Sequence, residues 1–159
     1  MNLPPEISAP FRLQPLYMER VWGGRVLETA FRRDLPENSG PVGESWEVVD
    51  RPEEQSVVQD GPLAGLTLHE LWLHHREAVF GAAAPDSERF PLLVKMLDAR
   101  DTLSIQVHPP AAVAAQFGGE PKTEMWYIAK ADPDAALYWF ARMLDGGVDA
   151  CRTADQDQA

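Results

Sequence analysis

The sequence has almost no cysteine and no long apolar run. Cys151 is the only cysteine among 159 residues, so the chain cannot form an internal disulfide, which favours an intracellular compartment. The amino terminus lacks the basic start and apolar run of a signal peptide, and no segment approaches the ~20 apolar residues of a membrane span. These absences predict a soluble cytoplasmic protein without a membrane partner.

Positive charge is also scarce. The chain carries 14 Lys and Arg residues against 25 Asp and Glu residues, which gives a net charge of -11 and a pI near 4.7. Nucleic-acid phosphates would be repelled by such a field, so we expect no nucleic-acid partner. A local basic pocket can still bind a small anion. The length and the hydrophobic content of 45% fit one domain of ordinary size with a real core.

Turn-forming residues are frequent throughout the chain. The 14 prolines and 11 glycines are scattered and divide the sequence into short segments, a pattern that favours a β-rich fold. Apolar and β-branched residues between these breaks predict strands over residues 44–50, 55–62, 91–99, 102–108 and 122–130.

Helical signals are fewer. Thr67 with Glu70 three residues later forms a capping box, which opens a predicted helix that ends at Gly81. A shorter helix is expected over 110–118, opened by a proline and stopped by a glycine. The segment "DPDAALYWFARMLDGG" (132–147) fits a helix by its apolar spacing and a buried strand by its aromatic run; we favour the helix.

Polar side chains interrupt the predicted strand "LSIQVHP". Gln106 and His108 are two positions apart, so a strand places them on one face, with Ser104 beside them. In "KTEMWY", Lys122 and Glu124 share a face in the same way. If the two strands are neighbours, an amide oxygen, an imidazole and a carboxylate converge, a set that suits zinc and also accepts manganese or iron. A solvated strand face would give the same pattern, so both interpretations stay open.

These two motifs together resemble the paired signature of the type I phosphomannose isomerases. Members of that family are zinc-dependent cupin enzymes that interconvert mannose 6-phosphate and fructose 6-phosphate. Four other segments are similar to the family in the same order along the chain: "VWGGRVLE", "GESWEV", "GPLAGLTLHELW" and "FPLLVKMLDARD". The resemblance covers residues 10–130.

The resemblance implies three ligands for one zinc ion, with manganese and iron as open alternatives. These ligands are Gln106, His108 and Glu124. It also implies a catalytic Lys122 close to the substrate. Proton transfer in such an isomerase passes through an enediol and needs a base, and the residues leave open whether Lys122 or a bound water has that role.

Three further residues would contact the sugar phosphate if the resemblance holds. Ser104 and Lys95 are expected toward the phosphate, and Glu44 is expected to line the pocket. Each also has a local alternative. Lys95 can extend its stem from a strand end, Ser104 can bond within its strand, and Glu44 can bond to nearby backbone.

The sequence fits the family pattern poorly after Ala131, and it lacks two of the family's later site residues. The family has a fourth ligand, a histidine in a later strand, but the four histidines here are His69, His74, His75 and His108. An arginine expected near the phosphate is also absent. His69 and His74 are five residues apart, so they do not share the helical face that a zincin site requires, and we expect surface or packing roles for them.

The expected architecture is mainly β, with cupin or jelly-roll-like sheets and flanking helices in an incomplete version of the family fold. We expect a metal-site domain over 1–130 and a divergent tail over 131–159 that is helical and then frayed. Exposed sheet edges would favour a homo-oligomer.

The resemblance implies a zinc-dependent aldose–ketose isomerase that interconverts mannose 6-phosphate and fructose 6-phosphate, and we expect a truncated form of it with impaired activity. The alternative is a non-catalytic cupin module that binds a metal or a sugar phosphate, or that acts as a partner subunit.

Overall fold

The computed structural model describes residues 10–106, 108–137, 141–142 and 148–149. The chain divides into two compact units, Met1–Ile105 and Gln106–Ala159. This division comes earlier in the chain than the domain boundary after residue 130 that the sequence predicts.

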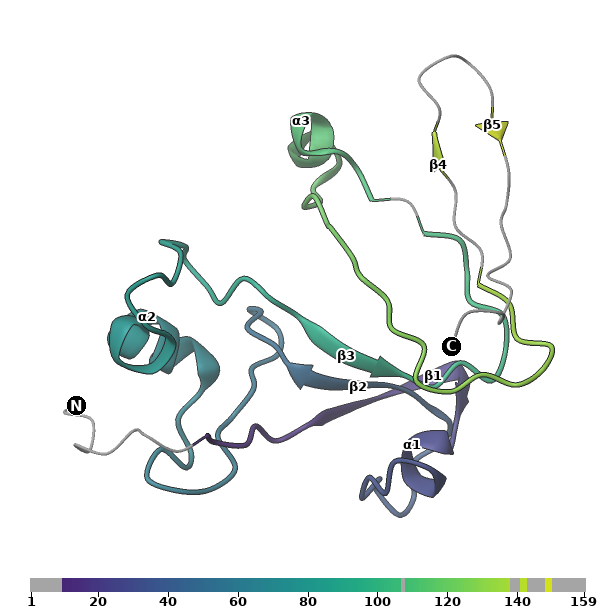
Figure 1. The fold of residues 1–159 in the computed structure, drawn as a ribbon, viewed down its shortest axis with the longest axis horizontal. Helices are drawn as coiled ribbons and strands as arrows, with labels where there is room; N and C mark the ends of the chain where they lie inside the picture. The colour runs from purple at the N-terminus through teal and green to yellow at the C-terminus, as the bar shows by residue number, and fades with distance from the viewer. Residues whose placement is uncertain (1–9, 107, 138–140, 143–147, 150–159) are drawn as a thin grey trace. The chain divides into compact units, whose positions relative to one another are not determined.

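A three-stranded antiparallel sheet forms the centre of the first unit (Figure 1). Its strands are β1 (Leu16–Gly24), β2 (Val42–Val48) and β3 (Val94–Leu97), in the order β1-β2-β3. The strands predicted over 44–50 and 91–99 correspond to β2 and β3. The strand predicted over 55–62 is wrong, because this segment forms only isolated bridges, such as the one between Val57 and Thr67.

Helix α2 (Leu68–Phe80) is the main helix of this unit, after the short α1 (Val26–Thr29). The predicted capping box is present: the Thr67 side chain accepts a hydrogen bond from the Glu70 backbone N–H, and the Glu70 carboxylate accepts one from the Thr67 backbone N–H at 2.8 Å. Gly81 ends the helix with a φ of 87°, a conformation that glycine adopts without steric cost. The helix therefore begins and ends where the sequence predicts.

Two clusters of buried side chains form the core. One lies between the sheet and α1, and the other packs the buried face of α2 against the segment that precedes it. The buried members of the first are Leu27, Leu35 and Val42, and those of the second are Val58, Leu63 and Leu71. Both clusters belong to the first unit, so this unit carries its own core.

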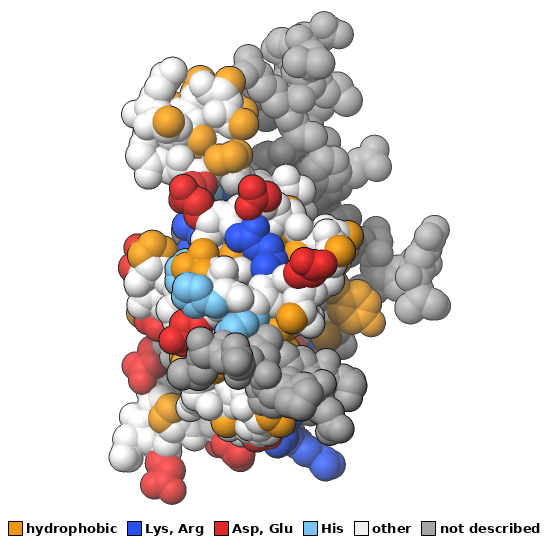
Figure 2. Space-filling view, turned by 90° about the vertical axis from the view of Figure 1, so that its left-hand side faces the viewer, with side chains coloured by type: hydrophobic (Ala, Val, Ile, Leu, Met, Phe, Trp, Pro, Cys, Tyr) orange, Lys and Arg blue, Asp and Glu red, His pale blue; other side chains and the backbone are white. Residues whose placement is uncertain are grey.

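A buried carboxylate connects α2 to the segments around it. The side chain of Asp50 accepts hydrogen bonds from Phe90 N at 2.8 Å and from Gln55 Nε2 at 3.0 Å, and it lies 3.0 Å from His69 Nδ1. Burial works against ionisation of Asp50, but these hydrogen bonds outweigh it and lower its pKa. His69 thus packs against a structural carboxylate. Figure 2 shows histidine side chains beside acidic ones on the face that carries α2.

The second unit contains the predicted short helix. Residues Ala111–Ala114 form α3 and Ala115–Phe117 continue as the 3₁₀ turn η1. Pro110 precedes the first turn, and Gly118 ends the element with a φ of 63°. The proline start and the glycine stop are confirmed.

Two predicted strands are not formed. Residues 102–106, His108 and the whole of 122–130 have no strand structure, while Val107 lies outside the described residues. A strand is stabilised by hydrogen bonds to a neighbour, so a sequence with strand propensity forms one only where a partner strand is available. The apolar pattern of these segments indicates the propensity but not the partner, and several of their large apolar side chains are exposed.

The helix predicted within 132–147 is also wrong where the structure describes it. Ala141–Arg142 form β4, which pairs antiparallel with β5 (Val148–Asp149). Aromatic residues favour strands as well as buried helices. The alternative prediction of a strand in this segment agrees with the structure at Ala141 and Arg142. The remaining predictions on 138–140, 143–147 and the frayed end at 152–159 fall outside the described residues. None of the helices in the described ranges is both long and apolar enough to cross a membrane.

Candidate functional site

Three of the predicted site residues come together in the second unit. His108 Nε2 lies 3.4 Å from Glu124 Oε2, and Lys122 Nζ lies 2.7 Å from Glu124 Oε1. Each of the three side chains is partly exposed, by 31%, 35% and 39% for His108, Glu124 and Lys122. A solvated ion could therefore reach the imidazole and the carboxylate.

The spacing of His108 and Glu124 fits two ligands of one metal ion. Donors bound at about 2.1 Å to a tetrahedral ion lie roughly 3.4 Å from each other, and the imidazole nitrogen and carboxylate oxygen are 3.4 Å apart. No group of three His, Cys, Asp or Glu side chains suited to a metal occurs among the described residues. A third protein ligand would therefore have to be another donor type, such as an amide oxygen.

The electrostatics of Glu124 favour its ionised form. The hydrogen bond from Lys122 lowers the pKa of Glu124, partial burial opposes this, and the nearby charges of Lys122 and His108 lower it further. Metal ligation requires a deprotonated carboxylate. Glu124 is thus in the form that a metal needs, although the Lys122 ammonium occupies its other oxygen.

Gln106 and Ser104 are less constrained. Gln106 is the first residue of the second unit and has an exposed side chain, and Ser104 is exposed in the first unit. The alternation argument that placed Gln106 with His108 assumed a strand, and no strand is present over residues 102–106. The contribution of Gln106 to a metal site therefore stays a prediction.

The other two predicted residues, Glu44 and Lys95, meet in the first unit. Lys95 Nζ is 3.5 Å from Glu44 Oε1 and 4.5 Å from the centroid of the Trp46 ring. Strand register explains this arrangement, because Trp46 on β2 faces Lys95 on β3 and Glu44 lies two residues from Trp46 on the same face.

Two residues of this cluster were not predicted from the sequence. The indole of Trp46 donates to Glu44 Oε2 at 2.9 Å, and Arg20 Nη2 on β1 donates to the same oxygen at 2.8 Å. The spacing of Glu44 and Trp46 within "GESWEV" could have indicated the first contact. The second contact depends on the pairing of β1 with β2, which no local sequence pattern indicates.

Glu44 is ionised despite its burial. Burial raises its pKa, but the hydrogen bond from Trp46 and the charges of Lys95 and Arg20 outweigh burial, so the pKa of Glu44 lies below its ordinary value. The cluster thus presents a fixed carboxylate between two cations.

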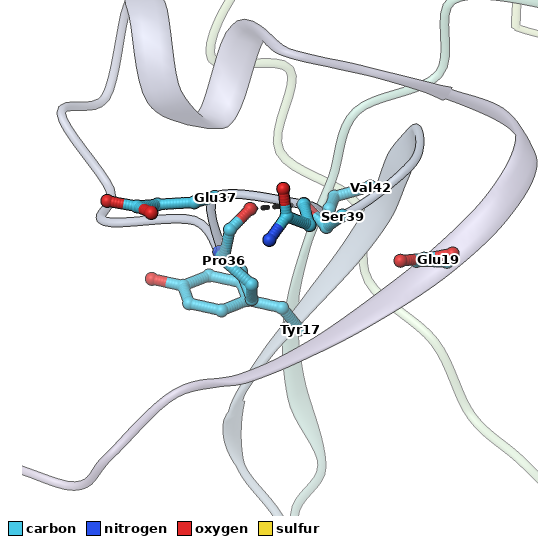
Figure 3. A pocket seen from close by; sticks show the side chains of 7 residues that line it. Tyr17, Glu19, Pro36, Glu37, Ser39 and Val42 are labelled. Carbon is cyan, nitrogen blue, oxygen red and sulfur yellow. Dashed lines mark hydrogen bonds between the residues drawn. The ribbon is translucent and has the colours of Figure 1, made fainter.

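An open hollow of the first unit lies elsewhere. It has a volume of about 370 Å³, and none of the seven predicted site residues lines it. Figure 3 shows Tyr17 beside Pro36 at this hollow, where the Ser39 hydroxyl donates a hydrogen bond to the Pro36 carbonyl at 2.8 Å. Its lining has no Lys, Arg or His side chain, so we do not assign the site to it.

Comparison with known proteins defines the family. The family described as "Phosphomannose isomerase type I, catalytic domain" matches residues 10–135, which is most of the chain. The chain therefore belongs to the type I phosphomannose isomerases, a family of enzymes. The resemblance read from its motifs is confirmed.

Individual relatives agree with this assignment. The chain is 45% identical over 133 residues to the probable mannose-6-phosphate isomerase GmuF of Bacillus subtilis, covering 82% of this chain and 41% of the relative. It is 42% identical over 134 residues to the mannose-6-phosphate isomerase of Streptococcus mutans, covering 84% of this chain and 41% of the relative.

A solved structure supports the fold class. The mannose-6-phosphate isomerase of Bacillus subtilis matches with a TM-score of 0.63 and 41% identity, over 72% of this chain and 35% of that one. The mainly β class, with an antiparallel sheet and a few short helices, is confirmed and fits an incomplete cupin-like fold. The chain spans about 41% of the length of the curated relatives that it matches.

Proposed function

We propose that the chain carries metal-binding and sugar-phosphate-binding residues of a mannose-6-phosphate isomerase. The observation that carries this proposal is the 3.4 Å approach of His108 to Glu124, within a family of such isomerases. Gln106, His108 and Glu124 would hold one zinc ion, with manganese or iron as alternatives.

The donor set suits aldose–ketose isomerisation. A bound metal would polarise the sugar carbonyl or hydroxyl oxygen and stabilise negative charge there. Lys122 supplies a positive charge next to the same carboxylate, so it would hold an oxyanion or a phosphate oxygen near the ligands. Proton transfer between the two sugar carbons needs a base; the candidates are a bound water and Lys122, the latter only as its neutral amine.

The proposal also assigns sugar-phosphate contacts to Glu44, Lys95 and Ser104. Lys95 brings a positive charge and Glu44 an ionised carboxylate that accepts hydrogen bonds from sugar hydroxyls, while Ser104 offers an exposed hydroxyl. The expected ligand is a small phosphorylated sugar. A cytoplasmic location and a homo-oligomer formed through sheet edges remain part of the proposal.

A second function, a non-catalytic module that binds metal or sugar phosphate, has one observation in its favour. No group of three His, Cys, Asp or Glu side chains that could hold a metal ion is found among the described residues, so His108 and Glu124 stand as a pair of such donors. Two donors and an amide would hold zinc weakly, and a loosely oriented substrate reacts orders of magnitude more slowly. We therefore expect little or no isomerase activity from this chain alone.

Both functions can be separated with the purified 159-residue chain. Mannose 6-phosphate turnover is measured with added zinc, together with equilibrium binding of zinc and of mannose 6-phosphate. Binding of both without turnover supports the non-catalytic module, and slow turnover supports an impaired isomerase. Turnover near the enzyme median of about 10 per second would contradict the impairment. Failure to bind either ligand would overturn the proposed function.

A further inference from the structure

Arg20 reaches a buried carboxylate that its own strand does not carry. Its Nη2 lies 2.8 Å from Glu44 Oε2 and its Nη1 donates to the Glu19 carbonyl at 3.0 Å, so both ends of the guanidinium are fixed. The Arg20 side chain is 37% exposed, whereas that of Glu44 is 11% exposed. The pair is thus partly shielded from solvent, where a charge-assisted bond is stronger than at an open surface.

Gly43 allows this approach. A Cβ atom at position 43 would lie 2.6 Å from Arg20 Cβ and 2.6 Å from Trp22 Cζ3, closer than real side chains pack. The chain of β1 is irregular here, with register shifts between Met18 and Gly24. The glycine and the irregular strand together bring the Arg20 side chain onto β2 next to Glu44.

The two oxygens of Glu44 have different partners. Oε2 accepts from both Arg20 and the Trp46 indole at 2.8 and 2.9 Å. Oε1 faces Lys95 at the longer distance of 3.5 Å. Two short bonds on one oxygen fix the plane of the carboxylate, and this determines the direction of the other oxygen.

We propose that Arg20 is a positioning residue that fixes the Glu44 carboxylate and directs its Oε1 toward Lys95 and the sugar phosphate. The part that concerns the ligand rests on the proposed function. Arg20 itself does not touch the ligand; it acts through Glu44. The charged and polar groups around Glu44 come from all three strands: Arg20 on β1, Trp46 on β2 and Lys95 on β3.

Loss of the Arg20 charge would make Glu44 easier to protonate. Burial, which favours the neutral acid, would then be opposed only by Trp46 and Lys95. A protonated Glu44 can no longer accept hydrogen bonds through both oxygens. Ligand binding that needs the ionised form would therefore weaken at a higher pH than in the wild-type chain.

The test uses the full chain with Arg20→Met, Arg20→Lys and, as a matched control, Arg12→Met. Arg12 pairs with Asp60 in the same unit, but it is largely exposed and precedes β1. Two quantities are measured against pH: the carbon chemical shift of the Glu44 carboxyl group by NMR, and the Kd for mannose 6-phosphate. The ratio of variant to wild-type Kd removes the titration of the ligand itself.

We expect the midpoint pH of the Glu44 titration to rise in Arg20→Met. In Arg20→Lys and Arg12→Met this midpoint should stay close to that of the wild-type chain. Binding by Arg20→Met should be about fivefold weaker than wild type at about pH 5 and close to wild type at about pH 8. A Kd ratio that is the same at every pH would indicate a merely structural loss and overturn the positioning role.

An unchanged Glu44 midpoint in Arg20→Met also overturns the inference. If the wild-type chain binds no mannose 6-phosphate at any pH, the proposed function fails, and the NMR titration still decides whether Arg20 positions Glu44. Should Arg20→Met not fold, Arg20→Gln replaces it, because glutamine removes the charge but keeps a donor of similar reach.

Discussion

The two units differ in how far their strands are paired. In the first unit, β2 has a hydrogen-bonded neighbour on each side, and the core clusters around Val42 and Leu71 fill the space beside the sheet and α2. In the second, "KTEMWYIAK" has strand propensity but no strand, and Met125 and Tyr127 are 92% and 87% exposed. Apolar alternation therefore becomes a sheet only where a second strand supplies hydrogen bonds and burial.

The largest contrast is expected between two tryptophans. Trp72 on α2 is buried, packs edge-on against Phe80 and Phe90 at 5.1 and 5.3 Å, and donates to the Ser87 carbonyl at 2.9 Å. Trp72→Ala should lower the free energy of unfolding by about 3–5 kcal/mol. Denaturant unfolding followed by circular dichroism gives this value.

The matched control for this change is Trp126→Ala in the second unit, where the side chain is 48% exposed. We expect the free energy of unfolding to fall by no more than about 0.5 kcal/mol, as for other surface substitutions. Equal losses for the two tryptophans would contradict the account that the buried clusters of the described residues lie in the first unit.

The second contrast concerns two glycines. Gly43→Ala would place a methyl group 2.6 Å from Arg20 Cβ, so we expect a loss of about 1–3 kcal/mol through overpacking. Gly119→Ala meets Pro109 Cγ only at 3.5 Å and should be close to neutral. Thermal unfolding of both variants measures the difference. A stable Gly43→Ala variant would mean that β1 and β2 can separate without cost.

The third prediction is a pH dependence. The pKa of Asp50 in the folded chain is lower than its ordinary value of 3.8, so folding favours the ionised form. Its contribution to stability is therefore complete above about pH 4 and is lost as the pH falls through the lower folded pKa.

Asp50→Asn tests this contribution. The substitution should cost roughly 1–3 kcal/mol at neutral pH, because a buried charged acceptor is replaced. The difference in the free energy of unfolding between the wild-type chain and the variant should become smaller below about pH 4. Urea unfolding from about pH 3 to pH 7 measures this difference. A difference that grows in acid would contradict the claim that the ionised form of Asp50 stabilises the fold.

The smallest effect is expected at the helix cap. Thr67→Ala removes the oxygen that accepts from the Glu70 N–H and should destabilise α2 by about 1 kcal/mol. Thr123→Ala, at an exposed position of the second unit, serves as the control and should be neutral. Hydrogen exchange of the first α2 amides would report the loss of the cap directly, and unchanged exchange would show that the cap is not needed.

The sequence predicted elements whose signals are local. The Thr67 capping box, the Gly81 stop and the Pro110 start each act within a few residues, and each is present in the structure. The strands over 102–108 and 122–130 were wrong because their formation depends on distant partners. Arg20 was missed for the same reason, since its contact to Glu44 depends on how β1 pairs with β2.

The candidate site was predicted in part. We predicted from the spacing within "KTEMWY" and from the family motif that His108, Lys122 and Glu124 lie close together. In the structure, Glu124 lies 3.4 Å from His108 and 2.7 Å from Lys122. Gln106 depended on strand alternation, which the structure does not show, so its ligand role still rests on the family resemblance.

The most direct test of the metal-site proposal is a calorimetric zinc titration of the full chain. The wild-type chain should bind one zinc ion, His108→Ala should bind it at least about tenfold more weakly, and His74→Ala on α2 should match the wild type. Zinc binding that is the same in wild type and His108→Ala, or that is lost in His74→Ala, would contradict the assignment of His108 and Glu124 as metal ligands.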